Sequence, residues 1–209
     1  MKKYELTEET VTVYGKTLYR IRAVRDFGSV KTGEFGGYIE KEENLSHFGN
    51  AWISGDAWVY GDARVFDNAK VYGDAKVYGD ARVSGDAWVY GDARVSGDAR
   101  VFDNAKVYGD AKVYGDAWVY GNAWVYGNAE VFNTRHFFVQ GPIGSRDGYV
   151  TFYRTKDDTI GVRCGCFSGS LQKFVDRVEE THGGSRYEKE YKIAAELAKV
   201  CIRLEGESR

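Results

Sequence analysis

A gapless six-residue repeat occupies the middle of the sequence and constrains the fold more than any other feature. Residues 51–134 form fourteen consecutive hexads of the pattern A-x-[VI]-x-[GDN]-[DNT]. Ala holds the first position of every hexad, and Val or Ile holds the third. A short fixed period of this kind is typical of a solenoid, in which each repeat packs only on its neighbours.

Each hexad reads as a short strand followed by a corner. Its first four residues alternate small or branched side chains with polar or aromatic ones, which is the pattern of a half-buried strand. The last two residues, most often Gly-Asp, suit a turn, because Gly adopts positive φ and Asp bonds to its own backbone. A helix is excluded, since its period is near 3.6 residues and recurring Gly weakens it.

Three hexads are expected to close one coil of eighteen residues. The sequence supports this number, because residues 63–80 are identical to residues 99–116. The shift is 36 residues, or two whole coils, and it returns every side chain to its own face. The expected coils are 45–62, 63–80, 81–98, 99–116 and 117–134.

The hexads resemble the hexapeptide repeat of left-handed parallel β-helices, in which an aliphatic residue and a small residue four positions later point inward. Val59 with Ala63, and Val65 with Ala69, match this pairing. The resemblance implies a mainly β fold, a left-handed parallel β-helix of about five coils, and a homotrimer. One departure is that the residue after the aliphatic position is often aromatic, as at Tyr60.

Residues eighteen apart form columns along the stacked coils, and one column alternates rings with cations. Such cations and rings attract each other. The column either binds a flat, anionic ligand or forms a subunit interface, where Trp, Tyr and Arg are enriched. We call this column the ladder; it consists of Trp52, Lys70, Trp88, Lys106 and Trp124. The tyrosines beside it are Tyr72, Tyr90 and Tyr108.

Charge makes nucleic acid an unlikely partner. The net charge is −2, so no basic field attracts phosphates. Acidic columns at two corners would repel them; these are Asp56, Asp74, Asp92 and Asp110, and Asp62, Asp80, Asp98 and Asp116.

Nothing in the sequence predicts export or membrane insertion. The first residues lack the apolar stretch of a signal peptide, and no run is apolar enough to span a membrane. The three cysteines give no disulfide framework. We expect no membrane partner and a cytoplasmic protein, in the host cytoplasm if a phage encodes it.

The two ends are expected to form separate units. Residues 1–44 read as a β-rich N-terminal cap containing a hairpin around Gly15, with Ile39 and Leu45 in step with the Ala column. Residues 135–209 read as a small α+β C-terminal domain with strands at 136–140, 149–154 and 160–166. Two helices follow, one capped by Ser170 and one by a capping box at Ser185 and Glu188.

Segments at both ends also resemble uncharacterised hexapeptide-repeat proteins of phages and prophages. They are GGYIE and ENLS near the start, and GPIGSR and CGCFSGSL in the tail. The resemblance implies a phage-related role but names no activity.

Two patterns in the tail carry candidate chemistry. Cys164 and Cys166 are expected on one strand face, where small core residues are favoured over a metal site, so we expect no metal and no cofactor. The loop 141–146 and the segment 168–170 offer backbone N–H groups for an anion, with arginines as countercharge. The ligand-binding candidates are Ser145, Arg146, Arg154, Arg163, Ser168 and Ser170.

These observations favour binding over catalysis. No nucleophile, base and orienting group are recognisable together. Hexapeptide acyltransferases use a histidine and an inserted loop, whereas His47 and His136 lie outside an uninterrupted array. We therefore predict a non-enzymatic, homotrimeric phage-type protein that sequesters a small anionic, nucleotide-like ligand such as a host defence signal. The alternatives are a structural or interaction module whose aromatic faces dock subunits or a host protein, and an acyltransferase-like enzyme.

Overall fold

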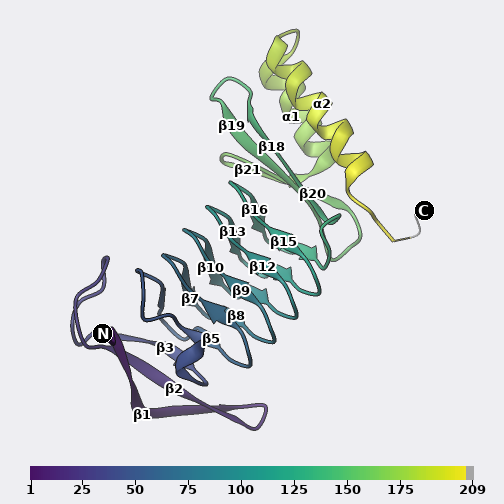
Figure 1. Ribbon diagram of the computed structural model, residues 1–209. Helices are drawn as coiled ribbons and strands as arrows, with labels where there is room; N and C mark the ends of the chain where they lie inside the picture. The colour runs from purple at the N-terminus through teal and green to yellow at the C-terminus, as the bar shows by residue number, and fades with distance from the viewer. Residues whose placement is uncertain (206–209) are drawn as a thin grey trace.

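The structure, a computed structural model that describes residues 1–205, is a parallel β-solenoid of about five coils with a β-rich region at one end and a small α+β domain at the other (Figure 1). The N-terminal hairpin and the two C-terminal helices lie at opposite ends of the stack. The mainly β solenoid expected from the hexads is therefore confirmed, whereas its left hand remains a prediction.

Three parallel sheets form the sides of the solenoid, and each hexad contributes one strand. The first face consists of β4 (Trp52–Ile53), β7 (Lys70–Gly73), β10 (Trp88–Gly91), β13 (Lys106–Tyr108) and β16 (Trp124–Tyr126). The second face contains β5 (Trp58–Val59), β8 (Lys76–Val77), β11 (Arg94–Val95), β14 (Lys112–Val113) and β17 (Glu130–Val131). The third face contains β6 (Arg64–Val65), β9 (Arg82–Val83), β12 (Arg100–Val101) and β15 (Trp118–Val119).

Strands of successive coils pair with a constant offset of eighteen residues. On the first face Val71 pairs with Val89, and Val89 pairs with Val107. The backbone N–H of Lys70 donates to the Ala87 carbonyl at 2.9 Å, and the backbone N–H groups of Trp52, Trp88 and Lys106 make the corresponding bond to the next coil. The coil length predicted from the internal duplication is therefore confirmed.

The interior contains little except the Ala and Val columns of the hexads. Every Ala at the first position and every Val or Ile at the third position has 0% exposure. Burial of one Val side chain contributes about 1.5–3 kcal/mol, so a core this narrow stabilises each coil modestly. Both ends of the stack consequently need a cover, because an open coil would expose its aliphatic residues and unpaired backbone.

Most corners turn through a glycine with positive φ, and the next coil passes close to it. Gly79, for example, has φ of +72°, and the backbone of Gly97 lies directly above it. Asp67 and Asp103 occupy the same turn position with φ of 59°. Their carboxylates accept hydrogen bonds at 3.1 Å from the N–H groups of Gly85 and Gly121, which explains why Asp can stand there.

The N-terminal region extends the second face beyond the first coil. The antiparallel pair β1 (Tyr4–Val13) and β2 (Lys16–Ala23) continues into β3 (Phe35–Ile39), which pairs in parallel with β5. A short 3-10 helix, η1 (Glu42–Asn44), follows.

The expected alignment of Ile39 and Leu45 with the Ala column is wrong. Ile39 pairs with Val59 and Leu45 with Val65, so both stand under the Val column with an offset of twenty residues. The reason is a longer corner at residues 46–50, which separates Leu45 from Ile53 by eight residues instead of six.

The C-terminal domain is an antiparallel sheet covered on one face by two helices (Figure 1). Its elements are β18 (Phe137–Ile143), β19 (Gly148–Arg154), β20 (Ile160–Cys164), β21 (Phe167–Ser170), α1 (Leu171–His182) and α2 (Arg186–Cys201). Ser170 and Ser185 cap the two helices as predicted. The Glu188 carboxylate accepts from Gly184 instead of Ser185, so the expected capping box is shifted by one residue. Within residues 1–205, no helix is both long and apolar enough to cross a membrane.

One sequence-based strand in this domain was placed wrongly. The strand expected at 160–166 ends at Cys164, and a separate strand begins at Phe167. Gly165, with φ of +54°, reverses the chain between them. Cys166 therefore lies in the turn, so the prediction that both cysteines share one strand face is wrong.

Two glycine substitutions test the tight stacking of the corners. A Cβ at residue 79 would lie 2.9 Å from the Gly97 nitrogen, whereas a Cβ at residue 121 meets nothing within 4 Å. Both positions have positive φ, which costs a non-glycine residue about 1–2 kcal/mol. We expect Gly79→Ala to lower the midpoint of urea unfolding clearly more than Gly121→Ala. Equal shifts in the two variants would contradict close stacking at this corner.

Candidate functional site

The ladder stands on the first face with one residue in each coil. Strand pairing places Trp52 beside Lys70, Lys70 beside Trp88, Trp88 beside Lys106, and Lys106 beside Trp124. The structure therefore confirms that rings and cations alternate along this column from one coil to the next.

The lysines of the ladder lie over the indole rings of neighbouring coils. The Lys106 Nζ atom is 4.8 Å from the ring centroids of both Trp88 and Trp124. The Lys70 Nζ atom is 5.5 Å from the Trp88 ring. Each such contact contributes about 0.5–1 kcal/mol at an exposed site. Lysine ammonium groups therefore already lie against the faces of Trp88 and Trp124.

A stack of tyrosines runs beside the ladder. The rings of Tyr72 and Tyr90 are 4.8 Å apart at an interplanar angle of 2°, and those of Tyr90 and Tyr108 are 4.7 Å apart at 5°. Tyr126 continues the stack at 4.6 Å from Tyr108. Burial raises the pKa of the Tyr90 hydroxyl to about 12. The first face therefore presents a continuous aromatic surface.

Trp52 differs from the other tryptophans of the ladder. It is buried, and its ring meets the edges of Phe27 at 5.3 Å and Tyr4 at 6.5 Å. Trp52 thus belongs to the junction between the N-terminal region and the first coil, and the exposed ladder begins at Lys70.

Arg163 joins the C-terminal domain to the ladder. Its guanidinium carbon lies 5.3 Å from the Trp124 ring and 5.8 Å from the Tyr126 ring, so one cation stands at the end of both columns. The Arg163 Nη1 atom donates to the Phe167 carbonyl at 3.3 Å. A second link is the hydrogen bond of 2.9 Å from the Trp124 N–H to the Thr151 hydroxyl.

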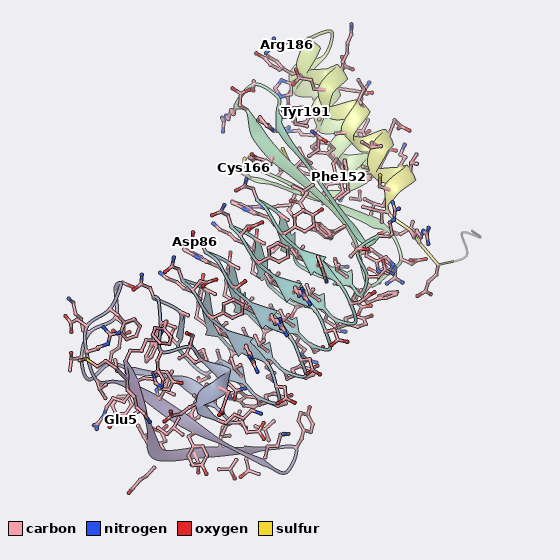
Figure 2. All side chains as sticks on the ribbon, viewed as in Figure 1. Glu5, Asp86, Phe152, Cys166, Arg186 and Tyr191 are labelled. Atoms are coloured by element: carbon pink, nitrogen blue, oxygen red, sulfur yellow. The ribbon has the colours of Figure 1, made fainter. Side chains whose placement is uncertain are left out.

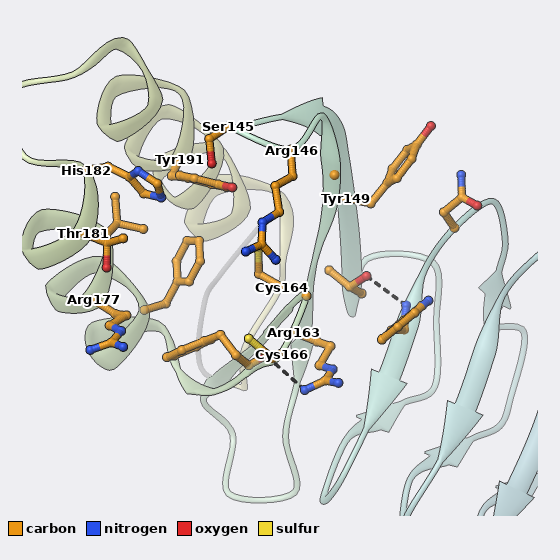
Figure 3. A pocket seen from close by; sticks show the side chains of 18 residues that line it. Ser145, Arg146, Tyr149, Arg163, Cys164, Cys166, Arg177, Thr181, His182 and Tyr191 are labelled. Atoms are coloured by element: carbon orange, nitrogen blue, oxygen red, sulfur yellow. Dashed lines mark hydrogen bonds between the residues drawn. The ribbon is translucent and has the colours of Figure 1, made fainter.

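A pocket of about 730 Å³ opens where the last coil meets the C-terminal domain (Figure 3). Three arginines line it from different elements: Arg146 from the β18–β19 turn, Arg163 from β20 and Arg177 from α1. Among the lining residues, all in the described part of the chain, none is Asp or Glu. The lining of the pocket is therefore cationic, although Arg177 also pairs with Glu180 at 3.2 Å, outside the lining.

Rings and protonated groups form the rest of the pocket wall. Tyr149, Phe167 and Tyr191 contribute aromatic surface. Burial raises the pKa of Tyr191 to about 12 and also raises the pKa of the Cys164 thiol. Both groups are thus protonated near neutral pH, which makes the thiol a poor nucleophile and the phenol a poor base.

The structure brings together three of the six ligand-binding residues expected in the tail. Ser145, Arg146 and Arg163 line the pocket. The other three lie outside it. Ser170 caps α1, and Ser168 pairs with Arg163 across β20 and β21.

Arg154 is buried, but it belongs to an ion-pair cluster with more exposed carboxylates rather than to the pocket. Its guanidinium lies 2.7 Å from the carboxylates of Asp158 and Glu205, and 5.0 Å from the Phe132 ring centroid. Because its charge is neutralised there, Arg154 helps to hold the domain on the last coil and is unsuited to a ligand.

Sequence reasoning missed Arg177, His182 and Tyr149. Arg177 lies one residue from the buried Val178, and helix periodicity alone places it at the edge of the covered face of α1. His182 follows at the end of the same helix, with its ring 5.6 Å from Tyr191. Which side of α1 faces the solenoid depends on how the domain docks, and periodicity does not encode that.

The two histidines considered for acyl transfer lie at opposite ends of the array. His47 stacks on Tyr4 at 4.3 Å, and its Nδ1 atom accepts from the Lys3 N–H. His136 is buried, and its Nδ1 atom accepts from the Phe132 N–H at 3.4 Å. Neither histidine lines the cationic pocket.

Part of the solenoid is similar to a known repeat family. Residues 75–91, 93–109 and 111–127 match the family model described as the YdcK beta solenoid repeat. The three matches begin eighteen residues apart, which agrees with one match per coil. No curated protein matches the chain. The chain is a β-solenoid repeat protein.

Removal of the Arg163 side chain tests the junction between domain and solenoid. Because Arg163→Ala loses two ring contacts, we expect a destabilisation of about 1–2 kcal/mol and faster hydrogen exchange in β19 and β20. Arg146→Ala is the matched control, since Arg146 is exposed and lies on the pocket rim. Identical exchange in both variants would show that Arg163 does not fasten the domain.

His136 predicts a specific pH dependence of stability. Burial, with Arg154 nearby, lowers the pKa of His136 to about 4. In the unfolded chain the His136 imidazole becomes protonated below about pH 6.5. In the folded protein the same imidazole stays neutral down to about pH 4. The stability contributed by the neutral ring is thus fully present above pH 6.5 and is lost as the pH falls.

We expect the midpoint of urea unfolding to fall less for His136→Gln than for the natural protein between pH 7.5 and pH 4.5. The free energies of unfolding obtained from these curves should fall by amounts that differ by about 2–3 kcal/mol. Parallel decreases in the two proteins would contradict a neutral, buried His136.

Proposed function

We propose that this protein is a non-enzymatic binding protein whose ligand is a small phosphate-bearing molecule with a flat ring, such as a nucleotide. The observation that supports this most is the set of Arg146, Arg163 and Arg177 in one pocket without a lining carboxylate. Arginine forks bind the oxygens of phosphates and carboxylates in pairs, and three arginines in one lining suit the several charged oxygens of a phosphate-bearing ligand.

The remaining wall supports the ring of such a ligand. A volume of about 730 Å³ lies in the range of small-molecule sites. Tyr149 and Phe167 supply aromatic surface near the arginines. Figure 3 shows Arg146 pointing into the pocket, with Ser145 and Tyr191 beside it and His182 beyond Tyr191. Phosphate and ring can therefore be held at different parts of one pocket.

Binding without turnover agrees with the protonation of the pocket. The thiol of Cys164 and the hydroxyl of Tyr191 have raised pKa values, so neither is activated for attack or proton abstraction. The resemblance of the chain ends to phage proteins favours a role in which the captured ligand is a host defence signal.

A homotrimer in the host cytoplasm remains part of this proposal. The third face offers a surface for it, since Trp118 is 41% and Tyr120 is 45% exposed. Arg100 stands over the Trp118 ring at 4.7 Å.

The same exposed rings favour a second candidate function. In this alternative the protein is a structural or interaction module, and the third face docks a host protein. The two functions differ in which residues matter, because the third face shares no residue with the arginine pocket.

Calorimetric titration with ADP and with adenosine tests the proposed ligand class. We expect ADP to bind and adenosine to bind at least tenfold more weakly, because the arginines contact the phosphates. Arg146→Ala and Arg177→Ala should each weaken ADP binding by about ten- to a hundredfold, since a charged hydrogen bond contributes about 1.5–3 kcal/mol.

Lys173→Ala is the matched control, because Lys173 is an exposed cation one turn before Arg177 and does not line the pocket. Equal affinity for ADP and adenosine, no binding of either, or an equal loss in the Lys173 variant would refute the proposal. Sedimentation of the same preparation gives its subunit number.

A further inference from the structure

A second hollow, separate in chemistry from the arginine pocket, follows the first face. This groove has a volume of about 850 Å³ and runs along the ladder from Trp52 to Trp124. The loop residues Ser29 and Val30 border it at the N-terminal end. Trp124 also lines the arginine pocket, so the groove reaches the C-terminal domain. Four steps of about 4.8 Å between coils give a length of about 19 Å.

Side-chain amides form one wall of the groove. They occupy the sixth hexad position at the corner that leads into the first face. The other two corners carry Asp at this position in four coils each, so the turn itself accepts Asp and does not require Asn. The column that lines the groove is Asn50, Asn68, Asp86, Asn104 and Asn122. Figure 2 shows Asp86 at this edge of the solenoid.

The charges that line the groove balance. Lys70 and Lys106 are offset by Glu34 and Asp86. A polyanion would meet these two carboxylates here and further acidic columns at the other corners. The groove therefore differs from the arginine pocket, where cations have no lining carboxylate beside them.

The rings of the groove are also unsuited to nucleobases. Lys106 lies over both Trp88 and Trp124, and Lys70 lies over Trp88. A base that stacked on these indoles would have to displace an ammonium group. The groove thus offers ring edges, the hydroxyls of Ser54 and Tyr72, and the amide column.

We propose that this groove binds a linear, uncharged carbohydrate chain lying along the solenoid axis. Every sugar hydroxyl both donates and accepts a hydrogen bond, and an Asn amide provides both functions. Four of the five coils present this amide, and the middle coil presents the Asp86 carboxylate, which accepts hydrogen bonds from sugar hydroxyls. Balanced charge also suits a neutral sugar, which brings no charge to the groove. This inference does not rest on the proposed nucleotide function.

Length-dependent binding is the test, with tryptophan fluorescence and calorimetry as readouts. The probes are cello-, chito- and malto-oligosaccharides from the disaccharide to the hexasaccharide. For at least one series we expect affinity to rise with chain length until the groove is filled. Asn68→Ala and Asn104→Ala should each weaken the hexasaccharide about two- to tenfold, as expected for loss of one neutral hydrogen bond.

Asp74→Ala and Asp110→Ala provide matched controls, because these residues hold the same hexad position at another corner. They should leave binding unchanged. The proposal is overturned if all three series fail to bind or if affinity is independent of length. It is also overturned if oligothymidylate or polyglutamate binds the groove more tightly than the sugars.

Discussion

The backbone N–H at the second hexad position donates to the carbonyl of the Ala seventeen residues further along, and this bond recurs from coil to coil. It fixes the offset between coils at eighteen residues, so every side chain stands directly beside its counterpart. An ordinary sheet can mix residue types from strand to strand, whereas here each choice is repeated as a column. The narrow Ala and Val interior, the glycine corners and the outer columns all depend on that register.

Register also explains the surface, because a column of identical charges about 4.8 Å apart repels itself. On the first face an indole separates the lysines, and each ammonium gains a ring contact. At the other corners exposed Asp residues stand in line but remain in water, where repulsion is screened. The alternation is a property of the first face, since Arg64, Arg82 and Arg100 stand next to one another on the third face. It continues into the C-terminal domain through Arg163.

The sequence predicts what the period controls, including the coil length, the buried columns and the alternation on the first face. It fails where the period is interrupted. The corner at 46–50 is two residues longer than the period requires, so Ile39 and Leu45 align with the Val column and not with the predicted Ala column. Gly165 forms a turn, so Cys166 lies outside the strand predicted for it. The pocket was only half predicted, because the meeting of Arg146, Arg163 and Arg177 depends on how a non-repeating domain docks. Arg154 is an arginine of the same domain, but it forms ion pairs with Asp158 and Glu205 and does not line the pocket.

The duplication of residues 63–80 at 99–116 has a consequence for how such a chain can change length. Gain or loss of 36 residues keeps every Trp beside a Lys and leaves a Trp for Arg163 to cover. Gain or loss of 18 residues would place two tryptophans or two lysines next to each other in the ladder, or would put a lysine in place of the Trp that Arg163 contacts. Recombination between the copies can therefore lengthen or shorten the solenoid only in steps of two coils. The number of coils thus stays odd or stays even, in addition to each coil having eighteen residues.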